Sequence, residues 1–141
     1  IDWELAGMGD PAWDIAGVFN AYLSCWILSM PVTGALTPEQ FIPLARYPLN
    51  SMQPTIRAFW DSYTRSVGLV PLDTERLLWR AVRFAAARLL QTTYESLQTE
   101  AQLNGNAIAM IQLSQSILQR PTEAIVQLLG IPLGQRRDAY N

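Results

Sequence analysis

The fold starts from the stretch Ile1-Asp2-Trp3-Glu4-Leu5-Ala6-Gly7-Met8-Gly9-Asp10-Pro11-Ala12-Trp13-Asp14-Ile15-Ala16. It gathers four carboxylates, two glycines and a proline. Ile1 to Trp3 has the pattern of the end of a strand, and Gly7 to Asp10 that of a turn. Asp10-Pro11 predicts a helix start, because Asp accepts free N–H groups at an N-cap and Pro loses no hydrogen bond at the first helical position. We therefore expect a strand end, a turn and then a helix.

The carboxylates of this stretch are the candidate functional groups. Asp2 follows the predicted strand, and a carboxylate at such a transition can hold Mg²⁺. The alternative is that Asp2 caps a turn, which is a common use of Asp. In an extended backbone, Glu4 lies on the same side as Asp2. There it either supports Asp2 from outside the metal's own ligands or is exposed to solvent. Asp10 is expected to cap the helix, and Asp14 is favoured in its first turn by the helix dipole.

The segment from Ile15 to Pro38 contains no charged residue. It predicts either a helix buried on nearly all sides, at the centre of an all-α core, or a membrane-spanning helix. Polar side chains interrupt the run, Pro31 ends it, and no Arg flanks it, so we favour the buried helix and no membrane contact. Cys25 lies within this run and is expected to be an inert core thiol.

Start and stop signals divide the rest of the chain into helices. Thr37 to Gln40 is a capping box that predicts a short helix. Longer helices are expected at about 54–67, opened by Pro54; from Asp73 as a cap to about 98; at 106–119; and from Pro121 to Gly130.

Hydrophobic periodicity assigns the buried faces of these helices. In the helix at 54–67 the inward residues are Ile56, Phe59, Trp60, Tyr63 and Val67. In the helix from 73 they are Leu77, Leu78, Ala81, Val82, Ala85, Leu89 and Leu97. In the helix at 106–119 they are Ile108, Ile111 and Leu118, and in the last helix they are Ala124, Ile125, Leu128 and Leu129.

Charged residues are expected on the outer faces. Asp61 is placed to form i,i+4 pairs with Arg57 and Arg65. A line of Arg76, Arg80 and Arg83 predicts a solvated or ion-paired face, with phosphate contact as the alternative.

The bulk composition limits the class of protein. At 141 residues, half of them hydrophobic, the chain suits one domain with a single core. A net charge of −2 argues against binding to nucleic acid or to an anionic membrane. A single cysteine allows no internal disulfide and suits a reducing compartment, so we expect a cytoplasmic protein.

The run I-D-W-E-x-A-x-x-G-D-P-x-x-D-I-A of residues 1–16 resembles the metal-binding segment of the aminoglycoside phosphotransferase / choline kinase-like family. That family has a kinase fold and phosphorylates alcohol groups of small molecules. The resemblance is looser over about 54–98, where Ala58 to Tyr63 and Arg80 to Tyr94 resemble helices of the family's C-terminal lobe, and vague beyond about residue 100.

The resemblance implies roles for four carboxylates. Asp2 matches the aspartate that holds Mg²⁺, with Glu4 as a possible supporting group. Asp14 matches an aspartate that braces the catalytic loop, and Asp10 matches the G-D-P aspartate, for which capping is expected. The implied phosphoryl donor is ATP or GTP, and the implied acceptor is a small-molecule alcohol.

The remaining catalytic parts of that family are missing from this chain. There is no His, all 10 basic residues are Arg, and no Gly-rich phosphate loop is present. We therefore expect the C-terminal part of a longer phosphotransferase, inactive on its own, because the family's catalytic loop precedes the segment of residues 1–16.

The predicted fold is all-α, the helical C-terminal lobe of a protein-kinase-like fold, with about six helices around a buried central helix. Residues 1–130 are expected to form this lobe and residues 131–141 a frayed tail. The alternatives are a non-enzymatic helical interaction module and a degenerate kinase-fold protein that binds nucleotide without transfer.

Overall fold

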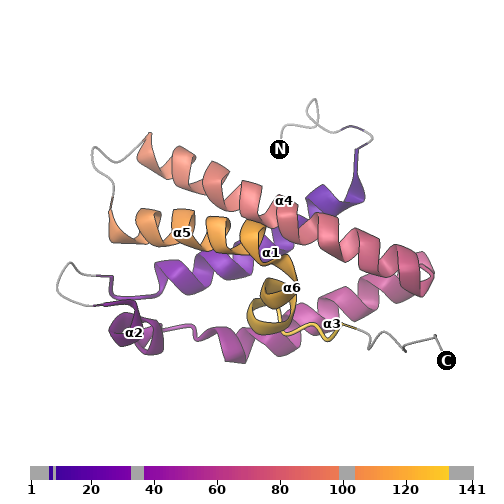
Figure 1. The fold of residues 1–141 in the computed structure, drawn as a ribbon, viewed down its shortest axis with the longest axis horizontal. Helices are drawn as coiled ribbons and strands as arrows, with labels where there is room; N and C mark the ends of the chain where they lie inside the picture. The colour runs from indigo at the N-terminus through magenta and orange to yellow at the C-terminus, as the bar shows by residue number, and fades with distance from the viewer. Residues whose placement is uncertain (1–6, 8, 33–36, 99–103, 134–141) are drawn as a thin grey trace.

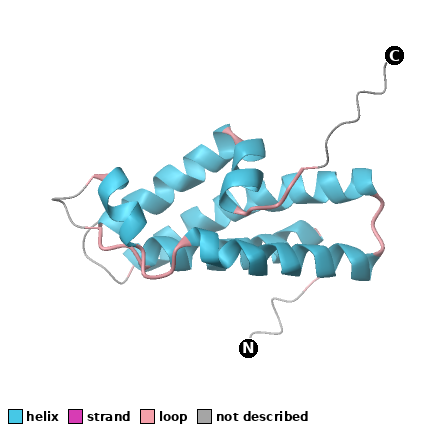
Figure 2. Cartoon of the chain, turned by 90° about the horizontal axis from the view of Figure 1, so that it is seen from below, coloured by secondary structure: helices cyan, strands magenta, loops and turns pink. Residues whose placement is uncertain are grey.

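The structure, a computed structural model, describes residues 7, 9–32, 37–98 and 104–133. Within these ranges all regular structure is helical, which confirms the predicted all-α class (Figure 2). The elements are α1 (Pro11–Leu28), α2 (Pro38–Phe41) with the 3₁₀ turn η2 (Ile42–Leu44), α3 (Leu49–Val67), α4 (Pro71–Leu97), α5 (Gly105–Gln119), and α6 (Pro121–Glu123) with the π-helical turn η3 (Ala124–Leu128). The strand end predicted at residues 1–3 lies outside the described residues.

α1 occupies the centre of the helical arrangement. Asp10 is its N-cap and Pro11 its first residue, as predicted. It packs mainly against α4 and also contacts α3 and α5, and Figure 1 shows it behind α4 and α5. Its buried residues are Ala12, Ile15, Ala16, Phe19, Leu23, Ser24 and Ile27. The central position predicted for this helix is therefore confirmed.

One side of α1 nevertheless faces solvent, against the expectation of burial on nearly all sides. Ala21, Cys25 and Leu28 are exposed there, and Leu28 is 61% exposed. The prediction that Cys25 is a core thiol is therefore wrong. The sequence of a helix without charged residues does not reveal which of its faces is buried, because apolar residues occur on every side. None of the described helices has the length and apolar character needed to cross a bilayer.

α3 begins at Leu49, five residues before the predicted start at Pro54. The carbonyl oxygen of Pro48 accepts hydrogen bonds from the backbone N of Ser51 at 3.1 Å and from its hydroxyl at 2.7 Å. These hydrogen bonds close the first turn of α3 before Pro54. Pro54, which was predicted to begin the helix, therefore lies inside it. The helix ends as predicted before Gly68, whose φ is 68°.

The aromatic stripe of α3 belongs to the core. Ile56 and Trp60 are buried, and Phe59 and Tyr63 are half-buried against them. Val67, at the end of the predicted stripe, is exposed.

The ion pairs predicted on the outside of α3 do not form in the described structure. Arg65 donates from Nε to the backbone oxygen of Asp61 at 3.1 Å, not to its carboxylate. Arg57 donates to the backbone oxygen of Gly130 at 3.4 Å. Backbone oxygens at a helix surface and at a turn compete with exposed carboxylates for guanidinium groups, which limits what spacing alone can predict.

α4 begins at Pro71 with Val70 at the N-cap, so Asp73 lies in the first turn and does not cap the helix as predicted. Its buried residues are Leu77, Leu78, Ala81, Val82, Ala85, Ala86, Leu89 and Thr93. Every predicted inward residue is among them except Leu97, which is half-buried.

α5 turns a different face to the core from the one predicted. Ala107, Met110, Ser114 and Ile117 are buried. Ile108, Ile111 and Leu118, the predicted inward residues, are 42%, 38% and 48% exposed. The Ser114 hydroxyl donates to the backbone oxygen of Ala86 at 2.8 Å. This buried hydrogen bond and the small residues bring α5 close to α4, and a count of large apolar residues could not reveal it.

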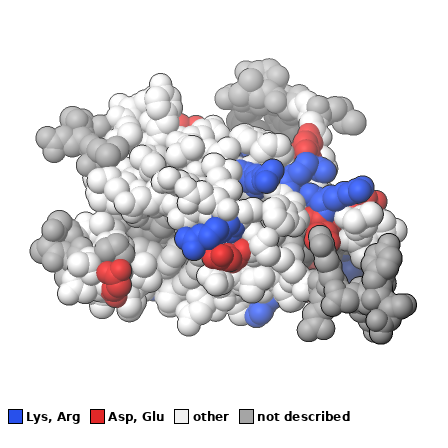
Figure 3. All heavy atoms as spheres, in the orientation of Figure 1, with Lys and Arg blue, Asp and Glu red and all other residues white. Residues whose placement is uncertain are grey.

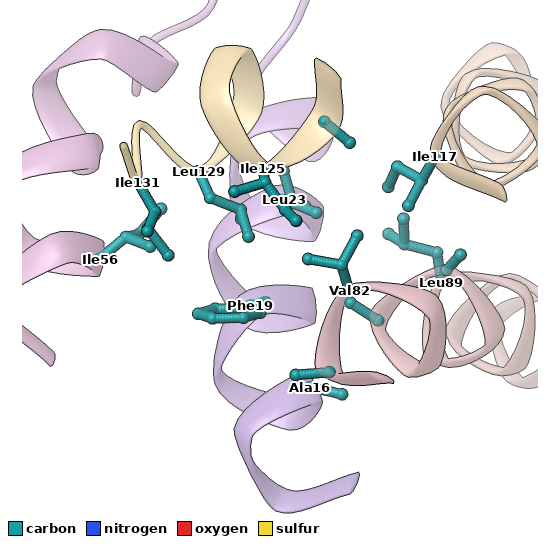
Figure 4. Close-up of a cluster of buried hydrophobic side chains, with 14 of the residues drawn as sticks. Ala16, Phe19, Leu23, Ile56, Val82, Leu89, Ile117, Ile125, Leu129 and Ile131 are labelled. Atoms are coloured by element: carbon teal, nitrogen blue, oxygen red, sulfur yellow. The ribbon is translucent and has the colours of Figure 1, made fainter. Parts of the chain in front are cut away.

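The residues that follow α5 complete the core. Ala124, Ile125 and Leu129 are buried, as predicted, whereas Leu128, also predicted inward, is half-buried. Gly130 has the positive φ of a helix stop, 67°. Ile131 is 3% exposed and lies beside Ile56 of α3 (Figure 4). The first residues after 130 are thus packed, and residues 134–141 of the predicted tail lie outside the described residues.

Candidate functional site

The candidate site lies where the start of α1 meets the middle of α4. Asp10 Oδ1 accepts a hydrogen bond from the backbone N of Ala12 at 3.0 Å, which caps α1. Arg80 donates from Nε to Asp10 Oδ2 at 2.9 Å and from Nη2 to Oδ1 at 3.2 Å. Such a two-pronged contact is the strongest geometry for a guanidinium and a carboxylate. One carboxylate therefore caps α1 and ties it to α4.

The surroundings of Asp10 favour its charged form. The backbone N–H of Ala12, and then the guanidinium of Arg80, lower the pKa of Asp10 below its ordinary value of 3.8, and slight desolvation opposes them. Both carboxylate oxygens are engaged at neutral pH. Asp10 therefore has the capping role predicted for it.

An aromatic and cationic stack adjoins this ion pair. The rings of Trp13 and Phe84 meet edge to face with centroids 5.5 Å apart. The guanidinium of Arg88 lies 4.4 Å from the centroid of Trp13, and its Nε is buried without a hydrogen-bond partner. Arg88 also covers Gly17, where an added Cβ would lie 3.5 Å from Cζ. Within the described ranges, a cation–π contact and no carboxylate therefore holds this half-buried guanidinium.

These contacts show that α1 and α4 run parallel along one seam. In chain order the contacting pairs are Asp10–Arg80, Trp13–Phe84, Trp13–Arg88 and Asn20–Thr92. The last pair is a hydrogen bond of 3.2 Å between side chains. Ascending numbers on both helices fix a parallel register, and Figure 1 shows both helices running in the same direction. The seam is ionic at its start, aromatic in its middle and polar at its end.

The other predicted site residues are distributed as follows. Asp14 lies exposed in the first turn of α1, one turn after Asp10, and makes no ion pair within the described ranges. Asp2 and Glu4 lie outside the described residues, so their predicted metal-binding and supporting roles stay predictions. Among the residues that are described, no three His, Cys, Asp or Glu side chains cluster as a metal site would require.

A pocket of about 320 Å³ opens beside the Asp10–Arg80 pair. Pro11, Tyr63, Leu77 and Arg80 contribute to it from α1, α3 and α4. Its apolar wall and ionic rim are typical of sites that receive a small polar organic molecule. Pro11, which belongs to the carboxylate-rich stretch, forms part of its wall.

Basic side chains gather over α4 on the face shown in Figure 3. Arg80 is bound to Asp10, and Arg76 lies 3.8 Å from Asp73. Arg83 lies over the ring of Trp79 with 5.8 Å between guanidinium and centroid. The ion-paired interpretation of this face is therefore confirmed for Arg76 and Arg80.

Sequence reasoning missed the partners of α1 on α4. Arg80 and Arg88 flank Phe84 at i,i+4 spacing, which places all three on one stripe. This stripe is visible in the sequence. Its contacts with Asp10 and Trp13 could not be predicted, because they depend on the register between α1 and α4.

No protein-family model, curated protein or solved structure matches the chain.

Proposed function

We propose that this chain is the helical C-terminal part of a Mg²⁺-dependent phosphotransferase that moves the γ-phosphoryl group of ATP or GTP to an alcohol group of a small molecule. The observation that carries the proposal is the I-D-W-E…G-D-P…D-I-A run of residues 1–16, within which Asp10 caps the helix α1 that begins at Pro11. We also propose a cytoplasmic location; the support for it is the single cysteine, which suits a reducing compartment.

The carboxylates of the run suit a hard cation. Asp2 and Glu4 offer the oxygen ligands that Mg²⁺ prefers, whereas Asp10 is occupied by Ala12 and Arg80. Asp2 would hold the ion, which supplies charge neutralisation to the phosphates when bound. Asp14, exposed and unpaired within the described residues, is free to brace a neighbouring loop, which is the role proposed for it.

The α1–α4 seam supports the proposal physically. Catalysis of phosphoryl transfer depends chiefly on the positions of charged groups, and a rigid scaffold is needed to hold those positions. The Asp10–Arg80 pair and the Trp13–Arg88 stack attach the start of α1 to α4, the longest of the described helices. The pocket beside Arg80 is our candidate for the place where the acceptor alcohol enters.

The first test of this function uses the longest open reading frame that contains these 141 residues. We expect a motif H-G-D-x-x-x-x-N within a few tens of residues before Asp2, and transfer of the γ-phosphoryl group to an alcohol by the encoded protein. The same motif with its acid replaced, together with nucleotide binding without transfer, would support the degenerate form instead. Unrelated sequence at that place would leave an interaction module.

A further inference from the structure

The pocket beside the Asp10–Arg80 pair has an apolar wall and charged groups at its opening. Leu77 is buried in that wall, and Leu69 and Tyr63 are half-buried in it. The ring of Tyr63 is stacked on that of Trp60 with 6.5 Å between the centroids, so packing holds it in place. In Figure 1 the end of α3 and the start of α4, which form much of this pocket, meet at the right of the molecule.

Two arginines one helical turn apart on α4 supply hydrogen-bond donors to this pocket. Arg80 binds Asp10 through Nε and Nη2, so its Nη1 has no partner in the part of the chain that the structure describes. Arg76 Nη1 lies 3.8 Å from Asp73 Oδ1, too far for a hydrogen bond, and the two side chains are 66% and 56% exposed. Exposed pairs of this kind contribute little to stability, so a ligand can displace Asp73 at low cost.

The charges around the pocket favour an anionic group over a cationic one. Of the described residues that line it, Arg76 and Arg80 are cationic and Asp73 is anionic. α4 begins beside them at Pro71, and its N-cap Val70 provides no side-chain hydrogen bond to the first turn. The free N–H groups of a helix start carry partial positive charge, which stabilises Asp73 when Arg76 turns to a ligand and attracts a further anion.

We propose that this pocket binds a small organic acid, with its carboxylate on Arg76 and Arg80 and its apolar body against Leu77 and Tyr63. A two-pronged bond between a carboxylate and a guanidinium is stronger than the separated contact that Arg76 makes with Asp73. The volume of about 320 Å³ is at the lower end for ligand pockets and suits a molecule with a single ring. A doubly charged phosphate is disfavoured, because Asp73 at the same opening repels it more strongly.

This inference narrows the substrate class of the proposed phosphotransferase. If the pocket receives the acceptor alcohol, that alcohol is a hydroxy acid. This last step rests on the proposed function, whereas the binding of an acid rests on the lining residues alone.

The test is a binding titration without nucleotide, observed through the NMR signals of the ligand. The protein is the product of the full reading frame that contains residues 1–141. The probes are benzoate, phenylacetate and mandelate, each compared with its uncharged amide. We expect at least one acid to bind with a dissociation constant of about 1 mM and its amide to bind at least about tenfold more weakly, because the amide cannot form charge-assisted bonds.

Three substitutions at exposed positions of α4 locate the binding. Arg76→Gln should weaken binding of the acid about tenfold and leave the amide unchanged. Asp73→Asn should tighten binding of the acid several-fold, because Arg76 loses its competing carboxylate. Arg83→Gln is the matched control and should change nothing, since Arg83 lies over the ring of Trp79 and does not line the pocket.

Several results would overturn the proposal. These are equal binding of acid and amide, no effect of Arg76→Gln, an equal loss with Arg83→Gln, or no binding of the three acids at about 50 mM. Weaker binding by Asp73→Asn would show that the pocket holds a cationic group, and tighter binding of inorganic phosphate than of the acids would show a phosphate site.

A separate assay with ATP and Mg²⁺ distinguishes this inference from the proposed function. Acid binding without transfer to mandelate or to any other alcohol would support the ligand class and count against the phosphotransferase. Transfer to uncharged alcohols by a protein that binds none of the acids would support the phosphotransferase and overturn the ligand class.

Discussion

At the scale of single residues, Asp10 connects the sequence to the fold. Its role as N-cap was predictable, because Asp followed by Pro is a strong local signal for a helix start. Its bond to Arg80 was not predictable, because 69 residues of chain separate the two and local spacing gives no information on their distance. One local and one distant partner on the same carboxylate make the residue sensitive to both substitution and pH.

Asp10→Ala should lower the melting temperature by a few degrees at pH 7, because it removes the cap and the partner of Arg80. The pKa of Asp10 is lowered in the folded state, so the stability it contributes is fully present above its ordinary pKa of 3.8 and is lost as the pH falls through the lower folded value. Thermal melts of both proteins at pH 7 and at about pH 2.5 check this. The difference between them should shrink at acid pH, and a constant difference would contradict the assignment.

The two glycines with positive φ allow a matched comparison. Gly68 and Gly130 have φ values of 68° and 67°. A Cβ at Gly68 would meet nothing within 4 Å, whereas one at Gly130 would lie 3.0 Å from Cβ of Gln53. The side chain of Gln53 is held by its own bond to the backbone oxygen of Gln127 at 2.7 Å, so it cannot move away freely.

Gly68→Ala should therefore destabilise the protein by about 1 kcal/mol, the usual cost of a left-handed conformation for a residue with a Cβ. Gly130→Ala should cost about 1 kcal/mol more, because Gln53 must also shift. Urea unfolding of both variants measures the difference. Equal losses would show that the contact with Gln53 does not constrain the turn.

At the scale of elements, helix existence was easier to predict than helix faces. The start of α1 and the stops at Gly68 and Gly130 follow from Pro, Asp and Gly chemistry that acts within a few residues. The buried face of α5 was predicted wrongly because large apolar residues lie on both sides of it: Ile108, Ile111 and Leu118 are exposed, whereas Met110 and Ile117 are buried together with Ala107 and Ser114. Burial of Ser114 depends on a carbonyl oxygen on another helix, which periodicity within α5 cannot show.

Ser114→Ala should destabilise the protein by about 1 kcal/mol, because it removes a buried hydrogen bond to α4. Ser116→Ala is the control, since that hydroxyl donates to the backbone oxygen of Gln112 in its own helix, at the surface. The control should change stability by less than about 0.5 kcal/mol. Chemical denaturation measures both, and a larger loss for Ser116→Ala would refute the proposed seam.

At the scale of the whole molecule, the fold class could be predicted from the sequence, whereas the arrangement of the helices could not. An all-α core around a charge-free helix follows from composition and periodicity. The parallel register of α1 and α4 arises only when α2 and α3 carry the chain back to its starting end. That register places Arg80 at Asp10 and both Phe84 and Arg88 at Trp13, and these contacts attach the carboxylate-rich stretch to α4.

Part of the candidate site could likewise be predicted from the sequence, and part could not. The carboxylates were identified from residue types in sequence, and Asp10 and Asp14 lie in the described residues where the helix start predicts them. The pocket beside Arg80 was not predictable, because α1, α3 and α4 all contribute to it. A site made by three helices needs the packing as well as the motif.

The central claim is that Asp2 holds the Mg²⁺ of a phosphotransferase, and a Mg²⁺ titration of phosphoryl transfer tests it most directly. The protein used is the product of the full reading frame that contains residues 1–141, as wild type and as Asp2→Asn, with Asp61→Asn on the exposed side of α3 as the control. We predict that Asp2→Asn lowers kcat at least about a hundredfold with unchanged helical circular dichroism, while Asp61→Asn stays within about twofold. Transfer by Asp2→Asn with wild-type kcat and wild-type Mg²⁺ dependence would contradict the account.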